Sequence, residues 1–191
     1  MSDKYKIRGN ENAYYLTLTV VGWVDVFSRL NQKQLIANSL NYCCKNKALI
    51  IYAYIIMSNH MHMLVQVEGK NTLSDILRDF KKHTSKRIIE NIFEEPESRR
   101  DWMLGYFSNA CSHLKRNQKY KVWQDGNHAI EISSAKLLYE KIDYIHNNPV
   151  EAGIVANAED YLFSSARNYS GLDNYVEVEV LNHEPLIKNW L

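Results

Sequence analysis

The hydrophobic pattern predicts three β-strands near the start of the chain. Residues 14–21 are rich in β-branched and aromatic side chains, a composition typical of a strand. Residues 49–57 form a nearly continuous apolar run, which predicts a buried strand. After a break at Ser58-Asn59, the side chains of residues 60–67 alternate between two faces. The last two segments are close enough in sequence to pair as a hairpin.

Helical periodicity follows in three other segments. Apolar residues recur at helical spacing over 31–46 and again over 72–92, where Thr72 is placed to cap the N-terminus. A third helix is expected to begin after Ser133 or Ser134. We expect it to end at Pro149, because the residue before a proline avoids the helical region.

The remaining segments complete the expected fold class. Residues 93–119 show little periodicity, and we interpret them as an insertion that holds a short helix around 102–115. Residues 120–123 and 129–132 have extended character, and the part after about residue 170 is expected to be a C-terminal extension. Strands and helices in this order predict an α+β sandwich, with one antiparallel sheet and helices on one face.

Length and charge place limits on this fold. The chain has 191 residues, of which 46% are hydrophobic, so residues 1–191 are expected to form a single domain with a full-sized core. Lys and Arg number 23 and Asp and Glu number 22. A globally basic chain would have indicated nucleic acid directly, so any DNA contact must come from a local cluster.

Two features of the sequence indicate where the protein is located: its cysteines and the length of its apolar runs. Cys43 and Cys44 are adjacent, which is poor disulfide geometry, and Cys111 is left over, so we expect reduced thiols. The N-terminal residues lack the apolar core of a signal peptide, and the run at 49–57 is too short to span a bilayer. These features predict a cytoplasmic protein with no membrane partner.

Basic residues gather within the helix expected over 72–92. Five of them lie within three helical turns: Arg78, Lys81, Lys82, Lys86 and Arg87. Lys82 follows Arg78 by four residues and Lys86 follows Lys82 by four, so a basic ridge along one face is expected. The ridge would suit the phosphates of a nucleic acid. A solvated charged face explains the same pattern equally well.

His60 and His62 are the first candidates for chemistry. Residues two apart on a strand point to the same face, so two imidazoles can offer nitrogens to one divalent cation. A pair of histidines that merely decorates a strand is the ordinary alternative. The buried strand that leads directly into the pair favours the metal site.

Tyr144 and Asn148 are the second candidates. They are four residues apart on the expected third helix and therefore share one face. An activated phenol is a nucleophile that can hold a phosphoryl group, and an amide oxygen can complete a metal site. The alternative is a half-buried tyrosine and a helix cap. The chain has 13 tyrosines, so spacing alone does not select Tyr144.

These motifs together resemble a known family. The stretch MSNHMHML at residues 57–64 resembles the signature of the REP-associated tyrosine transposases and the single-strand tyrosine transposases of small insertion sequences, which are of the His-hydrophobe-His (HUH) type. The sequence DYIHNNPVEAG at 143–153 resembles the second half of that family, as do Trp123-Gln124, His128-Ala129-Ile130 and the tail at 161–169. The resemblance covers residues 14–169 in order.

The resemblance implies a fold, a site and a reaction. The fold is a ferredoxin-like (RRM-like) sheet with an additional helix that carries the tyrosine. His60, His62 and Asn148 would hold Mg²⁺ or Mn²⁺, and Tyr144 would be the catalytic nucleophile. Its substrate would be hairpin-forming single-stranded DNA, cleaved to a 5′-phosphotyrosine and a free 3′-hydroxyl and then transferred to a new strand. Members act as monomers or dimers, so a homodimer stays open.

Three other functions are compatible with these residues. A relative with a host role would nick DNA without transposition. A catalytically idle nucleic-acid-binding module would use the same sheet, although the aromatic signature of RNA-binding strands is missing. A metal-dependent hydrolase would need a carboxylate cluster that the sequence does not offer. We expect a structural hydrogen bond for His128, with a metal or phosphate contact as the alternative, and a packing role for His146. The insertion at 93–119 is a candidate for target choice.

Overall fold

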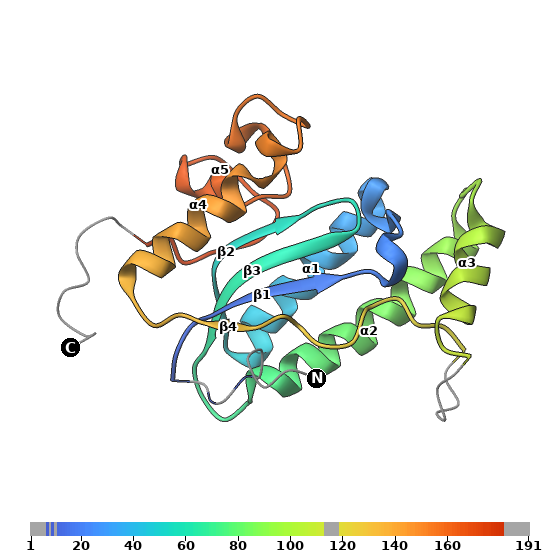
Figure 1. Cartoon of the computed structure of the whole chain (residues 1–191), viewed down its shortest axis with the longest axis horizontal. Helices are drawn as coiled ribbons and strands as arrows, with labels where there is room; N and C mark the ends of the chain where they lie inside the picture. The colour runs from blue at the N-terminus through green and yellow to red at the C-terminus, as the bar shows by residue number, and fades with distance from the viewer. Residues whose placement is uncertain (1–6, 8, 10, 113–118, 182–191) are drawn as a thin grey trace.

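The computed structural model describes residues 7, 9, 11–112 and 119–181, which contain a four-stranded antiparallel sheet (Figure 1). The strands are β1 (Tyr14–Thr19), β2 (Leu49–Ile56), β3 (His60–Val67) and β4 (Ile130–Glu131). Their order across the sheet is β2-β3-β1-β4, and β2 and β3 form the hairpin predicted from their hydrophobic pattern. The segment expected to be extended at 120–123 contributes only a bridge between Trp123 and Val20.

Helices follow the strands in the order that we expected. They are α1 (Leu30–Lys47), α2 (Leu73–Glu94), α3 (Arg100–Asn109), α4 (Ala135–Glu151) and α5 (Ala166–Tyr169), with short 3-10 turns η2 (Val21–Trp23), η3 (Val26–Ser28) and η4 (Ala158–Asp160). The chain order β1-α1-β2-β3-α2-β4, combined with the sheet order, is the ferredoxin-like arrangement. The α+β fold is thereby confirmed, and α4 is the additional helix.

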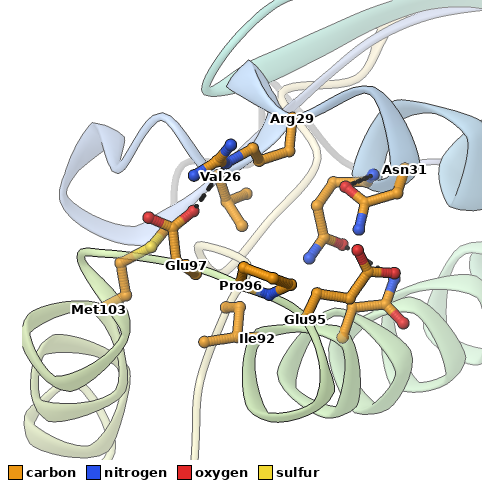
Figure 2. Close-up of a pocket in the computed structure, with 10 residues that line it drawn as sticks. Val26, Arg29, Asn31, Ile92, Glu95, Pro96, Glu97 and Met103 are labelled. Atoms are coloured by element: carbon orange, nitrogen blue, oxygen red, sulfur yellow. Dashed lines mark hydrogen bonds and ion pairs between the residues drawn. The ribbon is translucent and has the colours of Figure 1, made fainter.

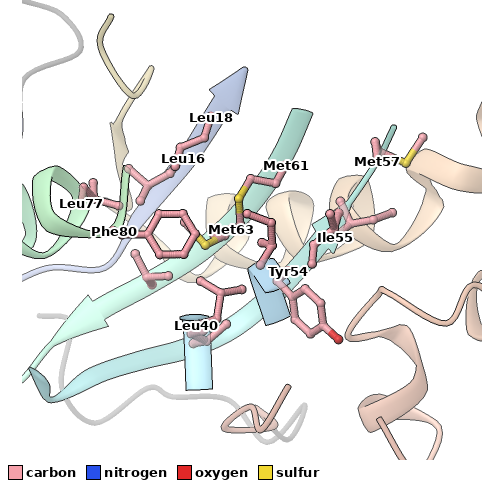
Figure 3. Close-up of a cluster of buried hydrophobic side chains, with 14 of the residues drawn as sticks. Leu16, Leu18, Leu40, Tyr54, Ile55, Met57, Met61, Met63, Leu77 and Phe80 are labelled. Atoms are coloured by element: carbon pink, nitrogen blue, oxygen red, sulfur yellow. The ribbon is translucent and has the colours of Figure 1, made fainter. Parts of the chain in front are cut away.

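The core lies between the sheet and the pair α1 and α2. Met61 and Met63 of β3 are fully buried, and Figure 3 shows them among side chains from β1, β2, α1 and α2. The others in this cluster include Leu16, Leu18, Leu40, Leu77 and Phe80. Because successive side chains on a strand point to opposite faces, His60 and His62 face away from this core, toward α4. Burial of the methionines therefore fixes which way the histidines point.

The N-termini of two helices are capped as the sequence predicts. The Thr72 hydroxyl accepts a hydrogen bond from the backbone N–H of Asp75, at 3.1 Å, and begins α2. The Ser134 hydroxyl accepts one from the backbone N–H of Leu137, at 3.2 Å, and begins α4. Each cap satisfies a backbone donor that has no partner inside the helix. Of the two serines considered for α4, Ser134 is the cap.

The predicted end of α4 at Pro149 is wrong. Pro149 lies inside the last turn, and the helix continues to Glu151. It closes at Gly153, whose φ is +68°, with hydrogen bonds from Gly153 N to Val150 O and from Ile154 N to Pro149 O. This pair of bonds is a Schellman motif, which satisfies the last carbonyl groups of a helix. The proline removes a single hydrogen bond near the helix end, and this C-terminal motif outweighs it.

A short helix, α3, lies within the segment interpreted as an insertion. It covers Arg100–Asn109, which overlaps the expected range, while residues 113–118 fall outside the described part. The loop before it is anchored by Glu97, whose side chain is 7% exposed and accepts a bond from Arg29 at 3.2 Å (Figure 2). The pKa of Glu97 is held below its usual range by a hydrogen bond from the Arg99 backbone N–H and by the guanidinium groups of Arg29 and Arg99. The segment is therefore docked against the N-terminus of α1.

The cysteines and the helices of the structure bear on where the protein is located. Cys43, Cys44 and Cys111 are free thiols, as expected, and Cys43 and Cys111 are buried. Within the described residues, no helix combines the length and the apolar character needed to cross a bilayer. The single-domain interpretation of residues 1–191 and the cytoplasmic location stay predictions.

Candidate functional site

The two histidines of the site share one face of β3, on the side of the sheet that α4 covers. Their ring centroids are 4.8 Å apart, and the rings meet edge to face. In the register of the sheet, Thr19 of β1 lies opposite His60 and Thr17 lies opposite His62. The strands on either side hold the histidine backbone in place, so the separation of the imidazoles is set by the sheet.

His62 is oriented by two hydroxyl groups from β1. Its Nδ1 lies 2.8 Å from the hydroxyl of Tyr15 and 3.0 Å from Oγ1 of Thr17. With Nδ1 occupied by these partners, Nε2 is the nitrogen that can bind a metal ion. Burial, the neighbouring His60 and Lys141 lower the pKa of His62 to about 3. The ring is therefore neutral near pH 7, the form that a metal ion requires.

His60 offers the same nitrogen. Its Nδ1 lies 2.7 Å from Oδ1 of Asn59, and because a carbonyl oxygen only accepts, Nδ1 donates and Nε2 keeps a free lone pair. Burial lowers the pKa of His60, so this imidazole also favours the neutral form. The ring of Trp23 contacts that of His60 edge to face at a centroid distance of 5.8 Å. Both histidines thus present Nε2 as a potential ligand.

Tyrosine rings contact His62 from two elements. Tyr144 of α4 has its ring centroid 5.4 Å from that of His62, and Tyr15 of β1 is at 5.5 Å. Tyr15 is 5% exposed, and burial, the largest cause, raises its pKa to about 12. Tyr144 is 42% exposed. Of these two phenols beside His62, only Tyr144 is accessible to a polymer that approaches from solvent.

Lys141 adds a positive charge beside both tyrosines. Its Nζ lies 4.8 Å from the ring centroid of Tyr15 and 5.7 Å from that of Tyr144. Lys141 is three residues before Tyr144, so the two lie on neighbouring positions of one face of α4. An ammonium group in this place favours a bound anion.

Asn148 lies one turn beyond Tyr144 on the same face of α4 and is partly buried. Across the described residues, no group of three or more His, Cys, Asp or Glu side chains could hold a metal ion. A third protein ligand for a cation at His60 and His62 would therefore be an amide or a hydroxyl. Asn148 fits that requirement, and its role stays a prediction.

The sequence signals do not single out four side chains of this site: Tyr15, Thr17, Asn59 and Lys141. In the sequence, Asn59 marks only a break between two strands. A weak signal exists for Tyr15 and Thr17, since they alternate on a strand, but only the pairing of β1 with β3 places them against His62. Lys141 carries no signal of its own, because its part in the site depends on the packing of α4 beside the histidines.

Helix α2 lies on the opposite side of the sheet, and four of its five basic residues line a groove of about 1210 Å³ against residues 119–127. Arg78, Lys81, Lys82 and Lys86 line this groove, together with Lys119 and Lys121 from the facing segment, whereas Arg87 does not. Three of the basic residues of α2 already form ion pairs with acidic side chains of the same helix. Arg78 pairs with Asp75 and Asp79, while Lys86 and Arg87 pair with Glu90.

Lys81 and Lys82 differ within this groove. The Nζ of Lys81 donates to the backbone carbonyls of Gln124, at 3.1 Å, and Gly126, so Lys81 fastens the facing segment to α2. Lys82 is exposed, and no acidic side chain in the described part of the chain pairs with it. The groove is therefore a candidate nucleic-acid surface in which Lys82 is the least engaged charge of α2. DNA contact by all five basic residues stays a prediction.

The structure also places the two remaining histidines named above. His146 is partly buried, and its Nε2 lies 2.8 Å from Oγ of Ser165, while its ring contacts that of Tyr169. His146 therefore has the packing role that we expected. His128 is exposed and has a φ of +40°. Its functional role stays open.

The site thus combines a ferredoxin-like sheet, a histidine pair and a helix-borne tyrosine, and comparison with known proteins gives the family. The family model described as "Transposase IS200 like" matches residues 24–120, just over half of the chain. The protein therefore belongs to the IS200-like transposase family, as the sequence motifs indicated, and is a transposase enzyme. No curated protein matches the sequence.

Two solved structures are similar to this chain. The REP-associated tyrosine transposase bound to a REP hairpin superposes with a TM-score of 0.63 at 21% identity, and the alignment covers 96% of each chain. A putative transposase from Deinococcus radiodurans R1 aligns with a TM-score of 0.43 at 15% identity, over 77% of this chain and 96% of the other. The first of these supports the fold of nearly the whole chain.

Proposed function

We propose that this transposase cleaves single-stranded DNA by attack of Tyr144 on a phosphodiester and then transfers the strand. The observation that supports this most directly is the position of Tyr144, which is 42% exposed and has its ring 5.4 Å from that of His62. The buried Tyr15 lacks this access. The proposed nucleophile and the two proposed metal ligands therefore lie together on the face of the sheet that α4 covers, and the nucleophile is the member that solvent reaches.

The bonds exchanged in the reaction balance without any external source of energy. The phenolic oxygen of Tyr144 attacks the phosphorus and loses its proton to solvent. The bond from phosphorus to the 3′-oxygen breaks, and that oxygen leaves as a 3′-hydroxyl after taking up a proton. The 5′-phosphotyrosine keeps the phosphodiester energy, so a 3′-hydroxyl from another strand can reverse the step and rejoin the DNA.

His60, His62 and Asn148 would hold Mg²⁺ or Mn²⁺ beside Tyr144. The donor set fits, because both imidazoles are held neutral by burial and their Nδ1 atoms are occupied by Asn59, Tyr15 and Thr17. A bound cation would offset negative charge on the scissile phosphate. Two imidazoles and an amide carry no charge, so we expect weak metal binding without DNA.

A hairpin is the proposed form of the substrate. The structure with the same fold at a TM-score of 0.63 is described as bound to a REP hairpin. In this chain, the groove between α2 and residues 119–127 offers Lys82, Lys86 and Lys119 to a nucleic-acid backbone. We propose that the groove holds paired DNA, while the face with Tyr144 receives a single strand.

The test of the nucleophile is a covalent adduct. The protein, Mn²⁺ and a hairpin oligonucleotide with a single-stranded flank are incubated and separated on a denaturing gel. Tyr144→Phe should fold and bind DNA but form no adduct, whereas Tyr42→Phe, a control tyrosine on α1 that is 58% exposed, should react like wild type. An adduct at wild-type level in Tyr144→Phe would move the chemistry to another tyrosine.

The position of the label reports the polarity of the linkage. Since Tyr144 should retain the 5′-phosphate of the downstream fragment, a label at the 3′ end of the oligonucleotide should remain on the protein, and a label at the 5′ end should be released. The opposite distribution would contradict a 5′-phosphotyrosine. Addition of an acceptor strand with a free 3′-hydroxyl should then remove the adduct and yield a joined product.

The metal ligands need a measurement that does not depend on cleavage. Mn²⁺ relaxation of water protons, recorded with uncleavable DNA present, should report binding by wild type. His60→Ala and His62→Ala should each abolish it, because a site with three protein ligands loses one donor. Binding that is unchanged in both variants would exclude this site.

The same assays separate the alternatives. A host nickase would form the adduct but fail to join the acceptor strand. A catalytically idle binding module would bind the hairpin and form no adduct in wild type. A metal-dependent hydrolase would cleave without any covalent intermediate. Exposure of Tyr144 beside the histidines favours the transposition chemistry over the idle module and the hydrolase.

A further inference from the structure

An exposed tryptophan borders the histidine pair. Trp23 belongs to η2, directly after β1, and is 59% exposed. Its indole contacts the His60 ring edge to face, at a centroid distance of 5.8 Å. Single exposed apolar side chains are common on protein surfaces, so the feature that matters here is the position of the indole directly beside His60.

The backbone that presents Trp23 is unusual. Gly22 and Trp23 both have left-handed conformations, with φ values of +60° and +57°. A bulky residue with positive φ is an outlier, and such residues persist where the surrounding structure holds them. The turn is held from the bend between β2 and β3, directly before His60, because the backbone N–H of Val20 donates to Asn59 O at 2.9 Å. Asn59 is also the side chain that orients His60.

A second support comes from α3. The ring of Tyr106 lies directly against Gly22, and a Cβ added at Gly22 would overlap the Tyr106 hydroxyl. Trp102 of the same helix has its ring 5.9 Å from that of Tyr106 and is 54% exposed. The helix within the segment at 93–119 thus braces the turn that presents Trp23.

We propose that Trp23 stacks on an unpaired nucleobase of the single strand, next to the phosphate that Tyr144 attacks. The proposal rests on the proposed function and adds a substrate-positioning residue to it. A single strand has one base for every phosphate, so a strand with a phosphate at His60 and His62 brings a neighbouring base to the edge where Trp23 lies. Stacking on an indole tolerates any base, because each has a π-face. Trp23 therefore sets the position of the strand without reading its sequence.

Binding of single-stranded DNA tests this inference without cleavage. All variants are made in the Tyr144→Phe background, with no divalent cation, and affinity is measured by fluorescence anisotropy. Trp23→Ala should weaken binding about 5- to 140-fold, the range for loss of one aromatic stacking partner. Trp23→Phe should recover part of this loss. Tyr42→Ala removes an equally exposed aromatic side chain from α1 and should leave the affinity unchanged.

Abasic substitution locates the base. Each nucleotide of the oligonucleotide is replaced in turn by an abasic site. One position near the cleavage point should weaken binding to wild-type Trp23 and have no further effect in Trp23→Ala, because the stacking pair is already lost. Independent losses at every position, or wild-type affinity of Trp23→Ala, would overturn the proposal.

The two proposals fail separately. The binding assay could show coupling between Trp23 and one base while the protein with Tyr144 intact forms no covalent adduct. That result would refute the proposed cleavage and retain the stacking. A normal adduct without such coupling would refute the stacking alone. Should Trp23→Ala not fold, Trp23→Phe decides the question. The abasic site should cost less affinity in Trp23→Phe than in wild type, and DNA should quench the tryptophan fluorescence of wild type more than that of Trp23→Phe. Equal abasic losses and equal quenching in the two proteins would overturn the proposal.

Discussion

The hydroxyl groups of Tyr15 and Thr17 determine how His62 presents its metal-binding nitrogen. Both lie within 3.0 Å of Nδ1, at 2.8 and 3.0 Å, and His62 is 5% exposed. Removal of one hydroxyl leaves the other as an acceptor for the Nδ1 proton. Removal of both, in the double variant Tyr15→Phe/Thr17→Val, leaves a buried N–H that water cannot readily reach.

The expected loss of Mn²⁺ affinity depends on whether the Nδ1 proton of His62 keeps one hydrogen-bond acceptor or loses both. A single substitution keeps one acceptor, so we expect Mn²⁺ affinity to fall by less than about 3-fold. The double variant leaves a buried donor unsatisfied, which costs about 1–3 kcal/mol. Loss of a hydrogen-bond partner behind a metal ligand lowers affinity by about 10- to 100-fold, or about 1.4–2.8 kcal/mol, which lies within that range. The effects of Tyr15 and Thr17 should therefore exceed additivity.

The assay is Mn²⁺ titration followed by proton relaxation, with uncleavable DNA present. Tyr52→Phe is the matched control, because Tyr52 is also a tyrosine of the sheet, and its hydroxyl bonds to Gln66 instead of to a histidine. Its Mn²⁺ affinity should equal that of wild type. The reasoning is refuted if the double variant binds Mn²⁺ like wild type, or if Tyr15→Phe alone loses as much as the double variant.

Three further predictions concern charge. Replacement of Lys82 and Lys86 by Glu should weaken hairpin binding and flatten its salt dependence, and an unchanged salt slope would assign both to a solvated face. Lys141→Met should slow adduct formation at least about 10-fold in a gel time course, since its ammonium group offsets phosphate charge, and an unchanged rate would exclude this role. Burial lowers the pKa of His146 to about 4, so below pH 6.5 the unfolded chain takes up a proton that the folded chain does not. Stability should fall by up to about 2 kcal/mol from pH 7 to pH 5 in urea titrations, and His146→Gln should lack this share of the loss.

Local sequence signals predicted most of the secondary structure. The strand at His60–Val67 has the predicted bounds, and the Thr72 cap begins α2 as expected. These features depend on side-chain alternation and on hydrogen bonds between neighbouring residues, which the sequence contains directly. The predicted helix end at Pro149 is wrong because the hydrogen bonds donated by the backbone N–H groups of Gly153 and Ile154 extend α4 by most of a turn.

The family could also be predicted from the sequence, because its motifs are contiguous. The histidine pair at 60 and 62 and the segment at 143–153 resemble the motifs of the tyrosine transposases, and the family match over residues 24–120 confirms the family. The identity of the metal ligands and of the nucleophile stays a prediction from the same motifs.

The sequence by itself determined which residues could take part in chemistry, since alternation on a strand and spacing on a helix are local properties. Only the tertiary structure decided how they are combined. The pairing of β1 with β3 joins residues 45 and 47 apart, and so brings Thr17 and Tyr15 to His62. The packing of α4 on the sheet leaves Tyr144 accessible beside His62, whereas Tyr15, of the same residue type, is buried there. No local pattern contains these contacts, because they depend on strand register and helix packing over the whole chain.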